Sequence, residues 1–169
     1  MGNCIGLFGT CGRSKWRDSF IELFKEESIE FFNPQVENWD PSLAEIEAEH
    51  LATDSIILFP ITSETYAVGS LAEVGFSVLS SIKLDDRRDF VVMIEQKLDE
   101  DLMKDSERAK ESLRARALVY QHLKAQNLPN IYLVDNFEEM MLVSDILYKS
   151  NIAKSGIARF SIKNRRNEK

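Results

Sequence analysis

Short apolar runs alternate with longer amphipathic segments along the whole chain. Runs of this length, bounded by turn residues, are typical of strands in a parallel sheet that is buried on both faces. The segments between them carry apolar side chains three and four positions apart, which is the spacing of one helix face. The pattern predicts strands at residues 4–9, 29–32, 55–61, 90–94 and 130–134. It predicts one helix beginning near residue 14 and further helices at 40–52, 70–82, 106–126 and 137–148.

Strand and helix therefore alternate five times, which favours an α/β fold with a parallel sheet and helices on both faces. Right-handed crossovers leave few topologies. We predict a flavodoxin-like, Rossmann-like three-layer sandwich whose five-stranded sheet has the order 2-1-3-4-5. In this order the carboxyl ends of the first and third strands meet at the point where open sheets bind ligands. The loop at residues 9–13 and the segment 60–73 are therefore expected to face each other.

The length of 169 residues is sufficient for one domain with its own core. We expect the α/β domain to span residues 1–150, followed by a basic C-terminal tail at 151–169. The formal net charge of −7 disfavours nucleic-acid binding by the domain as a whole. No apolar run has the length of a membrane span, and the N-terminus lacks the features of a secretory signal. The simplest expectation is a cytoplasmic protein that does not associate with membranes.

Cysteines and histidines are too few and too scattered to predict a metal centre. Cys4 and Cys11 lie near the N-terminus, and His50 and His122 lie in separate helical segments. Metal sites read from sequence have tighter clusters of such residues. The glycine pattern of dinucleotide-binding loops, the P-loop and the nucleophile elbow of hydrolases are also absent. We therefore expect no metal and no cofactor, and reduced cysteines.

Glu73 is the first candidate for chemistry because it follows the apolar strand and lies at the start of the next predicted helix. In a structural interpretation, Ser70 and Glu73 form a capping box that satisfies two amide donors at the helix start. In a functional interpretation, Gly69 lets the backbone approach a ligand and the free amides hold an anion. Glu73 would then act as a nucleophile toward a sugar carbon. The local pattern leaves both interpretations open.

A second carboxylate is available on the preceding helix, where Glu45, Glu47 and Glu49 alternate with apolar residues. Successive helical residues are turned by about 100°, so the three side chains cannot all face one way. Retaining glycosyl transfer needs a carboxylate nucleophile and an acid/base group about 5 Å apart. Glu73 and Glu47 are the candidates for such a pair, and a solvated position is the alternative for each acid on this helix.

Basic and aromatic residues near the same loops are candidates for ligand contacts. Arg17, with Arg13 and Lys15, either binds a phosphate or carboxylate or belongs to a basic surface patch. Trp39 follows a turn-rich stretch and is a candidate to stack on a base. Both the anion and the base interpretation are consistent with a nucleotide ligand.

Three other conspicuous side chains have structural interpretations. Trp16 shares helical spacing with Phe20 and is predicted to lie in the core. Arg114 and Arg116 stand on the charged helix 106–126 and are predicted to be solvated. None of these three residues is assigned to a site.

At these residues the chain resembles the nucleoside 2-deoxyribosyltransferase superfamily, and most closely its deoxyribosyltransferase-like branch. The resemblance covers roughly the first half of the chain, and its pieces occur in the family's order. They are the opening strand at 5–9, Lys15-Trp16-Arg17, Asn33-Pro34 followed by Asn38-Trp39-Asp40, the helix-borne acid Glu47, Thr53-Asp54 with the strand to Phe59, and Gly69-Ser-Leu-Ala-Glu73-Val-Gly75.

The resemblance implies a flavodoxin-like fold and cleavage of an N-glycosidic bond in a nucleoside or nucleotide. The family's nucleophile falls on Glu73, which would attack C1′ and form a glycosyl-enzyme, and another base or water would then accept the sugar. The family is typically oligomeric, with a neighbour's C-terminal residues completing the site. Together with Glu47, the residues expected at the substrate are Gly9, Thr10, Arg17, Trp39, Asp40, Gly69 and Ser70.

Two positions depart from the transferase pattern. The family's tyrosine in the first strand is replaced by Gly6, and its aspartate six residues before the nucleophile is replaced by Ala67. A hydrolase therefore stands beside a transferase as an interpretation. A non-catalytic nucleotide-binding or sensing protein on the same scaffold is a further alternative, as is a glycohydrolase for a dinucleotide such as NAD.

Overall fold

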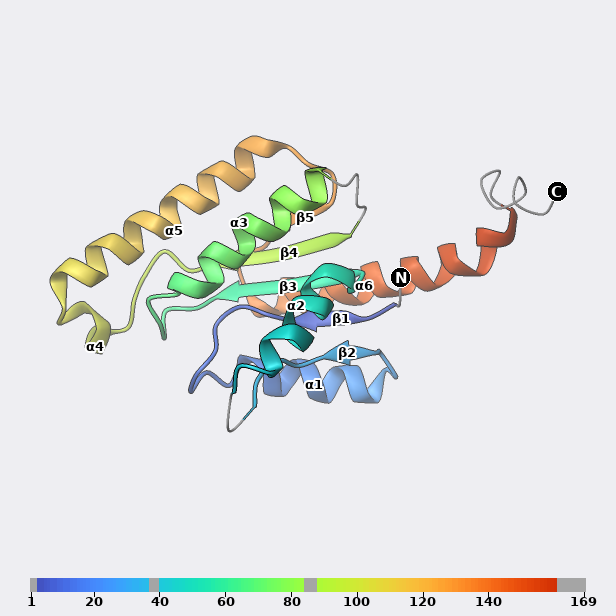
Figure 1. The fold of residues 1–169 in the computed structure, drawn as a ribbon, viewed down its shortest axis with the longest axis horizontal. Coiled ribbons are helices and arrows are strands. Elements are labelled where there is room, and N and C mark those ends of the chain that lie inside the picture. Colours follow the sequence, from blue (N-terminus) through green and yellow to red (C-terminus); the bar gives the residue numbers. More distant parts are fainter. Residues whose placement is uncertain (1–2, 37–39, 84–87, 161–169) are drawn as a thin grey trace.

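A five-stranded parallel sheet forms the centre of the molecule in the computed structural model (Figure 1), which describes residues 3–36, 40–83 and 88–160. The strand order is β2-β1-β3-β4-β5, and every neighbouring pair is parallel. The predicted fold class and strand order are therefore confirmed. The strands are β1 (Ile5–Leu7), β2 (Phe31–Phe32), β3 (Ile56–Ile61), β4 (Asp89–Ile94) and β5 (Ile131–Leu133).

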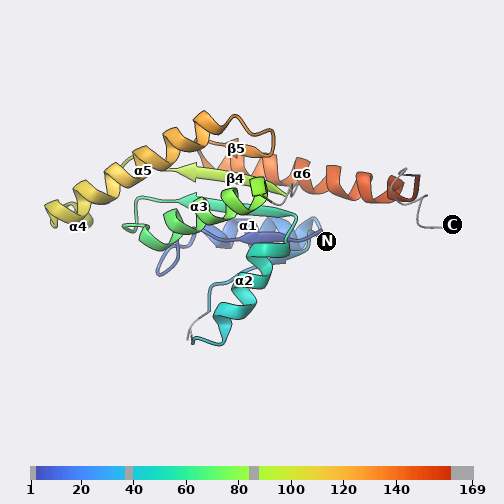
Figure 2. The same cartoon turned by 45° about the horizontal axis from the view of Figure 1, so that its top comes forward.

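Helices cover both faces of the sheet. Helices α1 and α6 pack on one face and α3 and α5 on the other, while α2 leaves the body of the molecule at an angle (Figure 2). Among the described residues, no helix has an apolar stretch of the length needed to cross a bilayer. The helices are α1 (Trp16–Glu26), α2 (Leu43–Thr53), α3 (Val68–Lys83), α4 (Glu100–Met103), α5 (Ser106–Gln126) and α6 (Phe137–Ile157), followed by the short 3-10 helix η1 (Ala158–Phe160).

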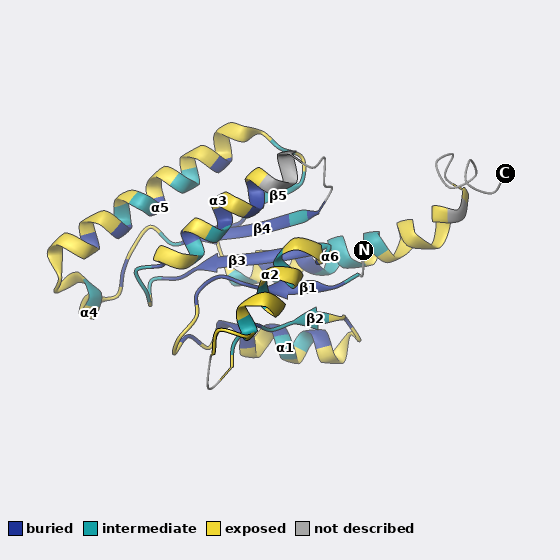
Figure 3. Cartoon of the chain, viewed as in Figure 1, coloured by how far each residue is buried: buried dark blue, intermediate teal, exposed yellow. Residues whose placement is uncertain are grey.

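Alternation along the central strands divides the core into two layers. Ile56 and Leu58 of β3 contact the layer formed by α1 and α6, whereas Ile57, Phe59 and Ile61 contact the layer formed by α3 and α5. All six residues of β3 are buried, as the uninterrupted apolar run predicts (Figure 3). Because burial of a large apolar side chain contributes about 1.5–3 kcal/mol, β3 is a principal source of the stability that fixes the topology.

Aromatic side chains fill the layer between α1, α6 and the sheet. Trp16 is 6% exposed and stacks on Phe137 with the ring centroids 6.3 Å apart. Phe20 packs edge-on against both rings. The predicted core position of Trp16 is therefore confirmed.

Several helix boundaries differ from the sequence prediction, and α2 begins at Leu43 instead of residue 40. Helix α3 begins at Val68, two residues earlier than expected, and α6 continues to Ile157 rather than ending near residue 148. The C-terminal part of α6 projects beyond the sheet (Figure 1), so the segment predicted as a tail begins as helix. Residues 161–169 of that segment lie outside the described residues.

The prediction that Arg116 is solvated is wrong. Its side chain is fully buried, and its guanidinium donates to the carbonyls of Thr62 at 2.9 Å, Thr65 at 2.6 Å and Glu95 at 2.9 Å. These carbonyls belong to the loops that follow β3 and β4. The planar guanidinium offers five donors, so one side chain on α5 satisfies acceptors from both loops. Arg114, as predicted, is exposed.

Replacement of Arg116 by methionine is expected to lower the free energy of unfolding by about 3 kcal/mol, because several buried carbonyls lose their donor. Urea denaturation followed by circular dichroism measures the change. Arg114→Met, on the same helix, is the matched control and is expected to stay within about 0.5 kcal/mol of the wild type. Equal stability of the two variants would contradict the role assigned to Arg116.

Candidate active site

The loops after β1 and β3 contact each other at the carboxyl edge of the sheet, as the topology predicts. The Thr10 amide donates to the Pro60 carbonyl at 2.9 Å, and the Thr62 amide donates to Thr10 Oγ1 at 2.9 Å. Gly9 has a φ of +97°, and a Cβ there would lie 2.6 Å from the Pro60 carbonyl oxygen. Only glycine suits such a conformation and approach. Gly9 and Thr10, both predicted at the substrate, are buried and join the two strands.

Arg17 provides a buried cation beneath this edge. Its side chain is 1% exposed, and its guanidinium donates to the Leu7 carbonyl at 2.9 Å and the Thr10 carbonyl at 2.7 Å. The group also lies over the Trp16 ring, 4.5 Å from the centroid. Burial lowers the pKa of Arg17, although arginine stays protonated in proteins. Arg17 therefore carries a fixed positive charge engaged by the protein's own carbonyl groups, unlike the exposed Arg13.

Glu73 lies in the second turn of α3, and the capping box predicted for it is not formed. The helix starts at Val68, and the Leu71 amide already donates to the Ala67 carbonyl at 2.9 Å. Ser70 is therefore inside the helix and does not occupy the cap position that the box requires. The structural interpretation of Glu73 as a capping residue is wrong.

Glu73, Glu47 and Arg17 interact electrostatically, although they come from three different helices. Burial raises the pKa of Glu73, and the charge of Glu47 raises it further, whereas Arg17 lowers it. The charges of Glu47 and Glu73 in turn act on the pKa of Arg17. Glu47 is half-buried, while Glu45 and Glu49 on the same helix are exposed. Glu47 is thus the acid of α2 whose charge acts on Glu73, and these two residues form the candidate carboxylate pair.

The other residues predicted to contact the substrate lie in different parts of the structure and differ in exposure. Gly69 is exposed at the start of α3, and Ser70 is half-buried. Asp40 is exposed, and its carboxylate accepts from the Ser42 amide at 2.8 Å just before α2. Hydrogen bonds from Ser42 lower the pKa of Asp40. Trp39 lies outside the described residues.

Sequence reasoning overlooked Glu64, which links the two loops of the carboxyl edge. Its carboxylate accepts from Thr62 Oγ1 at 2.9 Å and from the Ser14 hydroxyl. Ser14 therefore bonds across the loops and makes no side-chain cap bond to α1. The sequence does carry a signal for Glu64, because it belongs to the polar segment directly after the apolar strand. The carboxyl end of a central strand is where ligands bind in such folds.

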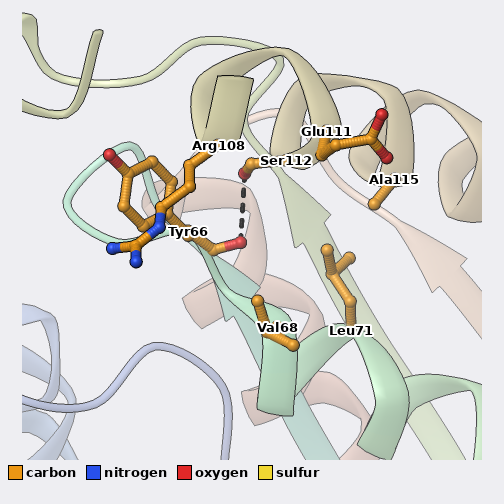
Figure 4. Close-up of a pocket in the computed structure, with 7 residues that line it drawn as sticks. All are labelled: Tyr66, Val68, Leu71, Arg108, Glu111, Ser112 and Ala115. Carbon is orange, nitrogen blue, oxygen red and sulfur yellow. Dashed lines mark hydrogen bonds between the residues drawn. The ribbon is translucent and has the colours of Figure 1, made fainter. Parts of the chain in front are cut away.

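Two cavities lie between α3 and α5, on the flank of α3 that does not carry Glu73. The larger has a volume of about 500 Å³, which is within the usual range for small-ligand sites. Figure 4 shows the Ser112 hydroxyl bonded to the Tyr66 carbonyl at one side of it and Val68 and Leu71 at another. The smaller, about 180 Å³, is lined by residues such as Val78 and Leu123. Neither is lined by a member of the carboxylate pair.

The fold and the carboxylate pair together define an α/β protein of flavodoxin-like topology with an acidic candidate site at its topological switch point. Residues 5–84 match the family model described as nucleoside 2-deoxyribosyltransferase like. The matched segment runs from β1 through α3 and contains Arg17, Glu47 and Glu73. The resemblance found in the sequence is therefore confirmed, and at the level of the family it indicates nucleoside binding and glycosyl transfer. No curated protein sequence matches the chain.

Glu73→Gln is expected to raise the free energy of unfolding at pH 7. Because the pKa of Glu73 is raised in the folded state, ionisation of its carboxyl opposes folding above that pKa. The gain should shrink as the pH falls through the raised pKa and vanish below the ordinary value of 4.5, where the carboxyl is protonated in both states. Urea denaturation of both proteins between pH 4 and pH 8 measures the difference.

Glu49→Gln, on the exposed side of α2, is the control and is expected to leave stability unchanged over the same range. A Glu73→Gln protein less stable than wild type at pH 7 would show that the electrostatic attraction to Arg17 outweighs burial and the repulsion by Glu47.

Proposed function

We propose that this protein cleaves the N-glycosidic bond of a nucleoside or nucleotide and passes the sugar to another base or to water. The observation that carries the proposal is the electrostatic coupling of Glu73 with Glu47 and Arg17, within the segment that resembles the deoxyribosyltransferase-like family. A half-buried carboxylate with a raised pKa at a switch point is typical of a catalytic group.

In the proposed reaction Glu73 is the nucleophile. One of its oxygens forms a bond to C1′ as the bond between C1′ and the base nitrogen breaks, and the base leaves with that electron pair. A proton reaches the departing base from Glu47, which acts as the general acid. The acceptor, a second base or water, then attacks C1′ and releases the Glu73 carboxylate, while Glu47 takes the acceptor's proton.

The mechanism requires Glu73 to be ionised when it attacks and Glu47 to be protonated when it donates. The fixed charge of Arg17 lowers the pKa of Glu73 and so favours the ionised nucleophile. In this role Arg17 acts on Glu73 through its charge and does not need to touch the substrate.

Release of free base is the direct test. Purified protein is incubated with ribonucleosides, 2′-deoxynucleosides, their 5′-monophosphates and NAD, and chromatography identifies the base released and any new nucleoside formed. Glu73→Gln is expected to lower the rate by at least about 10³-fold, and Glu47→Gln by about 10²–10⁴-fold. Exposed Glu45 on α2 provides the matched control, because Glu45→Gln should retain the wild-type rate.

The panel also separates the chemical alternatives. Transfer to an added base defines a transferase, release without transfer defines a hydrolase, and nicotinamide release from NAD defines a dinucleotide glycohydrolase. Equal release by wild type and Glu73→Gln would contradict the catalytic role of Glu73.

The rate of base release is expected to fall at acidic pH, because Glu73 must be ionised to attack. Burial, the largest cause, raises the pKa of Glu73, so the midpoint is expected above the ordinary glutamate value of 4.5. A pH profile of the substrate-saturated rate measures the midpoint. A midpoint at or below 4.5 would contradict the assignment of a half-buried Glu73 as the nucleophile.

A non-catalytic nucleotide-binding protein is the second candidate, and the two departures from the family favour it. Ala67 is apolar, 8% exposed and held at a φ of 55°. A Cβ at Gly6 would lie 2.6 Å from the Phe8 ring and 2.9 Å from the Asp54 carboxylate, so this chain has no room for the family's tyrosine. Calorimetry that detects tight binding of a monophosphate, with no base released, would identify this function. Assembly into a homo-oligomer, implied by the resemblance, stays a prediction.

A further inference from the structure

A second cluster of reactive side chains lies at the amino edge of the sheet, away from the candidate active site. Cys4 immediately precedes β1, Asp54 lies two residues before β3, and His50 is in the last turn of α2. The cysteine sulfur, a histidine ring nitrogen and a carboxylate oxygen of these residues all lie within 4.8 Å of one another. Sulfur, nitrogen and oxygen donors gathered in this way match the ligand set of a thiophilic divalent metal.

Asp54 supplies the observation that points to a ligand. The residue is 3% exposed, and its Oδ1 is 2.9 Å from His50 Nδ1. Its other oxygen, Oδ2, is buried and, among the described residues, has no partner in ordinary hydrogen-bond geometry, although the neighbouring Cys4 thiol interacts with the carboxylate and lowers its pKa. A buried carboxylate oxygen without a partner is costly, and native structures generally satisfy it with a donor or an ion. A cation bound between Asp54 and Cys4 would satisfy this oxygen.

The electrostatics of the cluster also favour a cation. Burial raises the pKa of Cys4 to about 12, and the charges of Asp54 and Glu30 contribute in the same direction. Burial raises the pKa of Asp54 as well, against the opposing influence of His50. The cluster is therefore a place where negative charge is poorly stabilised by the protein alone. A divalent metal stabilises the thiolate and the carboxylate together, and the thiol proton leaves on binding.

The histidine is already oriented. The His50 ring lies flat on Phe32, with the centroids 3.6 Å apart and the planes within 3°. Its side chain is 33% exposed, so the cluster opens to solvent on the α2 side. Protein ligands bind zinc at about 2.0–2.3 Å, which sets the donor atoms roughly 3.5 Å apart. The His50–Asp54 separation of 2.9 Å would therefore widen slightly on metal binding, and separations near the upper limit of 4.8 Å would shorten by about 1 Å.

We propose that Cys4, His50 and Asp54 form a three-ligand site for a zinc-type divalent cation, with a water molecule as the fourth ligand. The donor set disfavours calcium and magnesium, which take oxygen ligands. The bound cation joins the end of α2 to the starts of β1 and β3. Helix α2 has no buried residue of its own, so the metal would be its firmest attachment at this end. This proposal is independent of the activity proposed for Glu73.

Cobalt(II) is the spectroscopic probe for this site. The full-length protein, reduced and freed of metal with a chelator, is titrated with CoCl₂. We expect one equivalent to bind with a thiolate-to-cobalt charge-transfer band in the near ultraviolet and tetrahedral absorption in the visible, both abolished by added ZnCl₂. Cys4→Ser should remove the charge-transfer band, and His50→Gln and Asp54→Asn should each weaken cobalt binding at least about 10-fold.

The chain offers one matched control of each kind, its second cysteine and its second histidine, Cys11 and His122. Both are exposed, and Cys11→Ser and His122→Gln should titrate like the wild type. As a second measurement, ZnCl₂ should raise the melting temperature of the wild type by several degrees and leave that of Cys4→Ser unchanged. Circular dichroism of the metal-free proteins shows whether each variant is folded.

The wild-type cobalt spectrum decides the proposal even if a variant does not fold. Absence of a thiolate band in the wild type would overturn it. So would a band that disappears in Cys11→Ser, or cobalt binding of unchanged affinity in a folded Cys4→Ser protein.

Discussion

The buried guanidinium of Arg17 is the interaction on which the carboxyl edge of this protein depends. It binds the carbonyls of Leu7 and Thr10, at the end of β1 and in the following loop, and thereby fixes the loop that meets β3. The same charge acts on Glu73 and Glu47, which approach from two other helices. A buried arginine is costly unless its donors are satisfied, and here the protein's own carbonyls satisfy them. The group that shapes the loop thus also supplies the positive charge that two half-buried acids need.

Helix α2 connects the two edges of the sheet. Glu47 lies on the part of the helix whose electrostatic neighbours are Glu73 and Arg17, and His50 follows in the last turn beside Asp54 and Cys4. The helix has no buried residue and leaves the body of the molecule at an angle (Figure 2), so its position depends on contacts at its end more than on apolar packing. A ligand that binds His50 would therefore also influence the position of Glu47 on the same helix.

Family resemblance and local chemistry bear on the function in different ways. The match over residues 5–84 indicates nucleoside chemistry at the level of the family, and function resides in particular site residues more than in a fold. The resemblance places Glu73 at the position of the family's nucleophile, and Gly6 and Ala67 where the transferases have a tyrosine and an aspartate. The space beside Gly6 is occupied by Phe8 and by Asp54. Asp54 thus lies both at the departure from the family and in the proposed cation site.

The sequence alone determined the order of the elements, the limits of α5 and the burial of β3, because these follow from the periodicity of apolar residues within one segment. It also identified Glu73 and Glu47 as a candidate pair.

Tertiary structure decided the remaining features. Arg116 has the local pattern of a solvated residue, yet loops from two other strands bury it. Helix α3 starts at Val68, which removed the capping box, and Cys4 meets His50 only because β1 and β3 are neighbours. Such features depend on contacts between residues far apart in the chain, which leave no periodic signal in the sequence.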